Sequence, residues 1–265
     1  MTCSARLPVY TLLISAFVPD RAVLGPIRMQ GLVLLTLYVG GAAAALVVAA
    51  VIQKTLVPGD GLPFTMELPT YRRPTFRLWL SQVLSSVRAF LRRAGTIILL
   101  ATVALWLLLH FPRVEAPPGI EGNAATAYAL EHSAGGRLGH ALEPFIAPLG
   151  FDWKIGVGLV ASLAAREILV ATLAQIYATG SDEGASLRDA LRADLHRETG
   201  LPVFTPATVG SLLVFFVFAL QCTSTIAIMR RETNSWRWPA FAFSYLLALA
   251  YGASFVTYRV IGAFS

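Results

Sequence analysis

Five consecutive polar or polarisable side chains interrupt an apolar stretch near the end of the chain. They are Gln221, Cys222, Thr223, Ser224 and Thr225, between ATVGSLLVFFVFAL and IAIM. A broken membrane helix exposes backbone carbonyls and short polar groups to ions, and a sulfur among oxygens suits a borderline transition metal better than sodium or magnesium. The alternative is an unbroken helix whose hydroxyls bond to the carbonyl four residues earlier and whose cysteine packs as a small hydrophobe. The length of the polar run favours a break on an ion path.

A second cysteine lies beside a short apolar run at the start of the chain. Cys3 and Ser4 precede Leu7–Val18, which has twelve residues, whereas a spanning helix needs about 20. The run predicts a half-helix or re-entrant segment that begins near Pro8, because proline is tolerated in the first turn of a helix. Pairing of this cysteine with Cys222 across a pore is a hypothesis at this stage.

Two charged residues, Arg166 and Glu167, lie within the apolar sequence Trp153–Thr179, which predicts one continuous membrane helix. Charges at such depth cost roughly 2.5–3.5 kcal/mol each and are usually functional or paired. Ala164 and Ala171 share the helix row of Glu167, so another helix can approach closely there. Glu167 therefore either attracts a cation on a path or forms a structural ion pair, and both interpretations remain open.

The composition of the chain requires a membrane. Of its 265 residues, 56% are hydrophobic and 14% are charged, against about 25% charged in ordinary soluble domains. The stretches long enough to span are Gln30–Ile52, Ala94–Phe111, Trp153–Thr179, Ala207–Met229 and Pro239–Phe264. The predicted fold class is an all-α, polytopic integral membrane protein with about five to six membrane segments, including broken or re-entrant helices.

Basic residues set the predicted orientation. The connection 54–93 carries seven Lys and Arg residues and the connection 112–152 carries two, which places the first in the cytoplasm and the second outside. Alternation then places 180–206 inside. It also places Arg230, Arg231 and Arg237 outside, against the rule, unless the chain turns back at the polar run 221–225.

An amphipathic helix is predicted inside the basic connection. Apolar side chains recur every three or four residues from Phe76 to Leu91, with Arg77 and Arg88 turned away. The pattern is typical of a helix at the membrane interface or of one docked on another protein domain. We therefore divide the chain into 1–52, with the first membrane elements, the basic connection 53–93, and a C-terminal membrane region 94–265.

Several function classes lack their sequence signals. A P-loop requires G-x-x-x-x-G-K-[ST], and neither Lys54 nor Lys154 stands in one, so the chain is not expected to be a nucleotide-hydrolysing enzyme. The four histidines form no metal-binding pair, and we expect no closed zinc site and no bound cofactor. The basic residues fall in short groups between apolar runs, which suits a lipid bilayer as partner and not a nucleic acid.

Five ordered segments resemble the C-terminal membrane region of the FeoB ferrous iron transporters. CSARLPVYTLLISAFVP resembles the end of the first Gate motif, and FTMELPTYRRP resembles the Met-Glu-Leu-Pro-x-Tyr signature. FLRRAGTIILLATVALWLLLHFP, PLGFDWKIGVGLVASLAAREILVATLAQIY and QCTSTIAIMRRETNSWRWPAFAFSYLLALAY follow in order, the last being the second Gate region. Many members carry Pro-Cys where this chain has Gln221-Cys222, so the resemblance does not imply a break caused by proline.

The resemblance implies the membrane permease portion of a GTP-linked Fe2+ importer in the bacterial cytoplasmic (inner) membrane. Fe2+ is then the substrate, with Cys3, Cys222 and Glu167 as its transient ligands. The implied ion path comprises Cys3, Ser4, Glu167, Gln221, Cys222, Thr223 and Ser224. The alternatives are a nucleoside or other solute carrier of Gate type and a membrane scaffold that does not transport.

The resemblance also implies partners. Full family members begin with a cytoplasmic GTPase domain, and this chain starts almost at the first Gate cysteine. We therefore expect a fragment or one half of a split transporter, in which GTP binds to a separate N-terminal domain. That domain and small Feo accessory proteins are the expected partners, and a homo-oligomer is left open.

Overall fold

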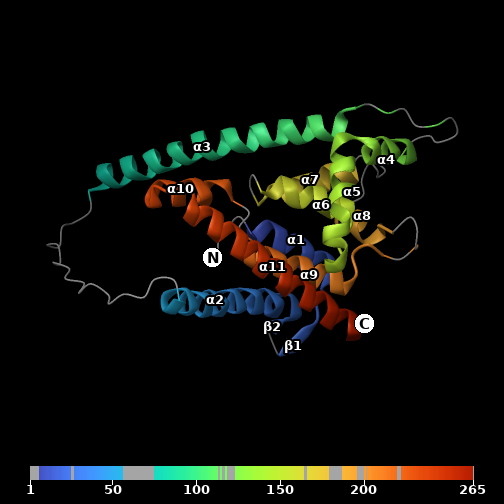
Figure 1. The fold of residues 1–265 in the computed structure, drawn as a ribbon, viewed down its shortest axis with the longest axis horizontal. Coiled ribbons are helices and arrows are strands. Elements are labelled where there is room, and N and C mark those ends of the chain that lie inside the picture. Colours follow the sequence, from blue (N-terminus) through green and yellow to red (C-terminus); the bar gives the residue numbers. More distant parts are fainter. Residues whose placement is uncertain are drawn as a thin grey trace.

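The fold is almost entirely helical, as the sequence predicts (Figure 1). The computed structural model describes residues 6–24, 27–55, 75–112, 114, 117, 123–163, 166–178, 187–195, 200, 202–219 and 222–264. A short antiparallel pair, β1 (Ala22–Leu24) and β2 (Ile27–Arg28), is the one sheet within these ranges. The helices are α1 (Leu7–Phe17), α2 (Met29–Thr55), α3 (Phe76–His110), α4 (Asn123–His132), α5 (Ala134–Ile146), the 3-10 turn η2 (Ala147–Leu149), α6 (Trp153–Ser162), α7 (Ile168–Ala178), α8 (Leu187–Ala193), α9 (Pro206–Phe218), α10 (Thr223–Thr233) and α11 (Arg237–Phe264).

Two helices among the described residues are long and apolar enough to cross a membrane, α2 and α11. A third candidate is the pair formed by α5 with η2 and α6, which is bent by 100°. Three shorter apolar helices, α1, α7 and α9, have 10–13 residues in their apolar parts. The predicted count of five to six membrane segments is therefore not confirmed, whereas the mixture of long helices and short apolar half-helices is present.

The amphipathic segment and the following apolar segment form one helix. The sequence predicts a helix over 76–91 and a separate membrane helix over 94–111, but α3 runs unbroken from Phe76 to His110. Nothing in 88–95 breaks a helix except Gly95, and a single glycine costs only about 1 kcal/mol there. Thirty-five residues at 1.5 Å each give about 52 Å, which exceeds the roughly 30 Å hydrocarbon thickness. Part of α3 therefore extends beyond any bilayer that it crosses.

The predicted continuous helix Trp153–Thr179 is wrong. Helix α6 ends at Ser162 and α7 begins at Ile168, and the two pack side by side. Lys154, at the start of α6, lies over the ring of Tyr177, at the end of α7. Gly158 meets Leu169 so closely that an added Cβ would lie 2.6 Å from a leucine methyl. The two helices are thus antiparallel arms of a hairpin, with Arg166 and Glu167 in its tip.

The hairpin changes the predicted order of crossings. Its two ends, marked by Lys154 and Tyr177, lie together near Asp194, so the chain enters and leaves the hairpin at the same end of the molecule, not at opposite ends. Figure 1 places the end of α2, the start of α3 and the turn between α10 and α11 together at the left, and α5, α8 and the C-terminus at the right. The turn between α10 and α11, which is flanked by Arg230, Arg231 and Arg237 in the sequence, therefore lies at the same end of the molecule as the end of α2 and the start of α3.

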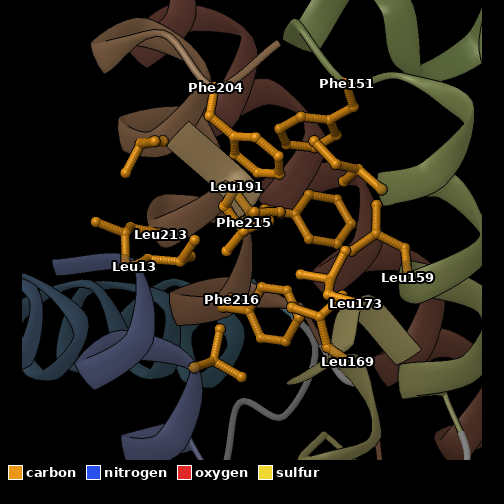
Figure 2. Close-up of a cluster of buried hydrophobic side chains, with 14 of the residues drawn as sticks. Leu13, Phe151, Leu159, Leu169, Leu173, Leu191, Phe204, Leu213, Phe215 and Phe216 are labelled. Atoms are coloured by element: carbon orange, nitrogen blue, oxygen red, sulfur yellow. The ribbon is translucent and has the colours of Figure 1, made fainter. Parts of the chain in front are cut away.

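The buried core surrounds the short apolar helices. Helix α9 packs against α1, α2 and α11, and it is apolar around its whole circumference, which is typical of a buried helix. Phe216 is fully buried, and Figure 2 shows it with leucines of α1, α7 and α9. Leu191 of α8 and Phe204 close the same cluster. This core fixes α1, α9 and the hairpin relative to one another, and these elements carry the candidate site.

Candidate functional site

The predicted interruption after the apolar stretch 207–219 is a real break in the backbone. Helix α9 ends at Phe218, and Ala219 and Cys222 are both extended, with ψ of 135° and 106°. A new helix, α10, begins at Thr223, and Cys222 occupies its N-cap position without a side-chain capping bond. Three polar members of the run, Thr223, Ser224 and Thr225, thus belong to the first turn of α10 and not to the break. Gln221 lies outside the described residues.

The tip of the hairpin touches this break directly. The Arg166 side chain is buried, with 8% of its surface exposed, and its Nη2 donates a hydrogen bond of 3.1 Å to the carbonyl oxygen of Ala219. Ala219 is the C-cap residue of α9, so the guanidinium lies at the negative, C-terminal end of a helix dipole. Two breaks that are 53 residues apart in sequence are therefore joined by one bond.

The start of α1 reaches the same place. Arg6 is 5% exposed and hydrogen-bonds to the Tyr10 hydroxyl, and both Arg6 and Arg166 act electrostatically on that hydroxyl. Pro8 lies in the first turn of α1, as predicted. The other end of α1 is held at a different level, because Arg192 of α8 donates to the carbonyl oxygen of Ala16 at 2.5 Å.

Three interrupted elements therefore meet at their inner ends. These are the N-terminus of α1, the tip of the α6–α7 hairpin and the C-terminus of α9. Their outer ends lie near α8 and the strand-like contact of Leu195 with Pro202. Helix ends inside a membrane expose backbone groups that must find partners, and broken helices of this kind line ion sites in transporters.

The predicted site residues are distributed unevenly around this meeting point. Glu167 adjoins Arg166 and is half-buried, and it forms no hydrogen bond or ion pair with any described residue. Cys222 lies three residues from Ala219, is partly exposed and is not in a disulfide. Cys3 and Ser4 lie outside the described residues, three and two positions before Arg6. Within the described part of the chain, no three His, Cys, Asp or Glu side chains cluster as a metal site.

A polar cluster at the base of the hairpin was not foreseen from the sequence. Lys154 Nζ donates to both carboxylate oxygens of Asp194 at 2.6 and 2.8 Å, and Tyr177 donates its hydroxyl proton to the same carboxylate at 2.6 Å. Asp152 caps α6 by accepting from the Ile155 amide at 2.9 Å. The sequence contained a signal for the hairpin that brings these residues together. The predicted crossings placed Arg230, Arg231 and Arg237 outside, against the positive-inside rule, and a hairpin at 153–178 removes that conflict.

Comparisons with known proteins identify the family of the chain. The Gate family model, described as nucleoside recognition, matches residues 91–236, and the model described as Ferrous iron transport protein B C terminus matches 34–85. The Fe(2+) transporter FeoB of Leptospira interrogans (serovar copenhageni, strain Fiocruz L1-130) is 41% identical over 268 residues, covering 100% of this chain and 38% of the relative. No solved structure matches the chain.

Two more distant relatives extend the likeness. The Fe(2+) transport protein A/Fe(2+) transporter FeoB fusion protein of Porphyromonas gingivalis is 36% identical, covering 98% of this chain and 33% of the relative. The Fe(2+) transporter FeoB of Staphylococcus aureus (strain COL) is 34% identical, covering 98% and 35%. The chain thus spans between a third and two fifths of the length of these curated relatives. With the Gate model covering more than half of its residues, the chain belongs to the FeoB family and corresponds to the family's C-terminal, Gate-containing membrane region.

Proposed function

We propose that this chain forms the part of a ferrous iron permease through which Fe2+ crosses the bacterial cytoplasmic membrane, as a multi-pass membrane protein. The proposal rests on the meeting of the two helix breaks at the Arg166–Ala219 hydrogen bond. Glu167 lies one residue from that bond and Cys222 three residues from it. A carboxylate and a sulfur beside exposed helix ends offer a divalent, borderline-soft cation both charge and a preferred ligand.

The proposed roles follow from ligand chemistry. Cys222 supplies sulfur, which favours Fe2+ over Mg2+, and Glu167 supplies the negative charge that offsets part of the cost of removing the ion from water. Cys3, three positions before Arg6 in the sequence, is proposed to supply a second sulfur, and Ser4, Gln221, Thr223 and Ser224 complete the proposed ion path. All of these ligands act transiently, since a transported ion must leave as readily as it enters.

Energy and accessory functions are assigned to other parts of the transporter. The relatives are transporters by name, and the P. gingivalis relative is fused to Fe(2+) transport protein A. In our proposal GTP is bound by a GTPase domain that belongs to the rest of the transporter, and an accessory protein of the Feo system contacts the assembly. The chain itself binds the substrate ion and lipid and carries out no chemical conversion.

We also propose an orientation that differs from the one first predicted. The end of α2, the start of α3 and the α10–α11 turn share one end of the molecule, and the connection 54–93 and the segment 230–237 carry ten basic residues in the sequence, which favours a cytoplasmic position for that end. The connections 112–152 and 180–206 then both face outward. Thiol labelling of intact cells tests this: Arg188→Cys is expected to react with an impermeant reagent, and Ser235→Cys is not. Reaction of Ser235→Cys from outside, with Arg188→Cys silent, would reverse the orientation.

Transport is tested with a chimera. In Leptospira FeoB the region of 268 matched residues is replaced by this chain, and the chimera is produced in a bacterium that lacks its own ferrous iron uptake. Uptake of radiolabelled Fe2+ per unit of membrane protein is expected to exceed that of the empty strain and to fall on Cys222→Ser. The intact relative and a chimera with the GTPase site disabled serve as upper and lower controls. A chimera that reaches the membrane in normal amount and never exceeds the empty strain would contradict the proposal.

A further inference from the structure

The Arg166 guanidinium occupies the position where a cation at the α9 break would be most strongly attracted. The last carbonyls of a helix lack partners within the helix, and the helix dipole places about half a negative charge at that end. Ala219, which is 2% exposed, ends α9 and offers its carbonyl oxygen to Arg166 Nη2 at 3.1 Å. A positive charge is thus already bound at the inner end of α9.

A second buried cation reinforces the first. Arg6 is 5% exposed and bonds to the Tyr10 hydroxyl, and the charge of Arg166 acts on the same hydroxyl. Two arginines from different elements therefore share one small buried region. Like charges repel one another more strongly in surroundings of low dielectric constant than in water. A divalent ion that entered the Cys222 segment in this arrangement would be repelled by both.

From these contacts, and on the basis of the proposed function, we propose that Arg166 is a tethered gating cation. It holds the carbonyl end of α9 in place of the transported ion, and Fe2+ binds at the Cys222 segment when the Arg166 side chain leaves the Ala219 carbonyl. The structure thus represents the closed arrangement of the path. Arg166 acts by position and charge and is not itself a ligand of the ion.

A matched contact elsewhere in the chain separates gating from simple helix capping. Arg192 also donates to a carbonyl at the end of a short apolar helix, that of Ala16 in α1, at 2.5 Å. Arg192 is exposed at the outer end of its helix, whereas Arg166 is buried at the inner end of α9. If both arginines served only to satisfy helix-end carbonyls, replacing either one would leave ion binding unchanged.

The test measures binding of Co2+, an air-stable stand-in for Fe2+ with similar ligand preferences, to the 265-residue chain purified in detergent. Titration calorimetry compares the unmodified chain with Arg166→Gln, Arg166→Lys, Arg192→Gln and Cys222→Ser, and circular dichroism checks that each variant is folded. Arg166→Gln keeps a hydrogen-bond donor and removes the charge, so its Kd for Co2+ is expected to fall about tenfold, within the Coulomb energy available. Arg166→Lys and Arg192→Gln are expected to bind as the unmodified chain does.

Each outcome decides something. An unchanged or weaker affinity of folded Arg166→Gln would overturn the gating proposal, as would equal tightening by Arg192→Gln. Where Arg166→Gln does not fold, Arg6→Gln takes its place and must tighten Co2+ binding by a smaller factor for the proposal to survive. The proposed ion path fails separately: if Cys222→Ser leaves Co2+ affinity unchanged while Arg166→Gln raises it, a cation site is gated by Arg166 but does not involve Cys222.

Discussion

Charged residues lie at both ends of the α6–α7 hairpin, but they find different partners at each end. At the base, Lys154, Asp194 and Tyr177 satisfy one another, with Asp194 12% and Lys154 21% exposed. At the tip, Arg166 binds a backbone carbonyl, and the neighbouring Glu167 has no hydrogen bond or ion pair to the described residues. The base pairs opposite charges with each other, whereas the tip separates them.

This difference identifies which charges hold the fold and which are available to a ligand. A buried ion pair with extra hydrogen bonds is hard to break without leaving one charge uncompensated. A carboxylate without a partner at the depth of a membrane is costly, and such a cost is usually connected with a functional role. The base therefore anchors the hairpin, and the tip presents charge to the meeting point of the helix breaks.

The largest effect is expected from breaking the base. Asp194→Ala leaves Lys154 and the Tyr177 hydroxyl without their common partner, and we expect the free energy of unfolding in detergent to fall by about 3 kcal/mol. Thermal unfolding followed by circular dichroism measures it. Glu232→Ala is the control, because Glu232 pairs with Arg231 on the surface, with 67% of its side chain exposed. A loss no greater than that of the control would show that the base does not anchor the hairpin.

The next effect concerns the helix break that the tip contacts. Cys222→Ser keeps size and polarity but exchanges sulfur for a harder oxygen, and we expect Fe2+ uptake by the chimera to fall about tenfold, as when a metal site is disturbed. The unfolding temperature is expected to stay nearly constant, because Cys222 is partly exposed. Cys222→Ala should reduce uptake at least as much. Uptake at the unmodified rate in both variants would make Cys222 a packing residue.

A smaller loss is expected at the tip itself. Glu167→Gln removes a charge that attracts the ion, which is worth roughly 1–2 kcal/mol for a divalent cation nearby, so we expect uptake to fall about fivefold with protein abundance unchanged. Should abundance or unfolding temperature fall instead, Glu167 belongs to a structural pair, like the residues of the base. Normal uptake together with normal stability would contradict both interpretations.

The smallest effect is expected from removing the Tyr177 hydroxyl from the base of the hairpin. Tyr177→Phe removes one hydrogen bond to Asp194 and leaves the ion pair with Lys154 intact, so we expect a loss of about 1 kcal/mol in unfolding free energy. Uptake per unit of protein should not change. Tyr251→Phe is the matched control, since its hydroxyl donates to the Phe145 carbonyl at an exposed position. A transport defect in Tyr177→Phe would mean that the base also takes part in conduction.

The sequence located the elements better than it arranged them. Hydropathy marked α2 and α11 and the short α1, because each is bounded by polar or turn residues. The polar run at 221–225 marked the end of α9 to within a few residues. The apolar sequence 153–179 predicted one long helix, because a hairpin with a short turn and a single long helix have nearly the same hydropathy. Arg166 and Glu167, which the sequence placed in the middle of that helix, lie in the turn between α6 and α7.

By itself the sequence determined an all-helical membrane protein of the FeoB type, with a cysteine at a helix break and charges buried in an apolar segment. Those properties depend on composition and on neighbours along the chain. The tertiary structure alone decided that Lys154 and Tyr177 lie together at one end of the hairpin, that Lys154 binds Asp194 across 40 residues, and that Arg166 reaches Ala219 across 53. The physical reason is that buried charges and helix ends must find partners, and the partners that satisfy them are chosen by packing in three dimensions, which periodicity along the chain does not record.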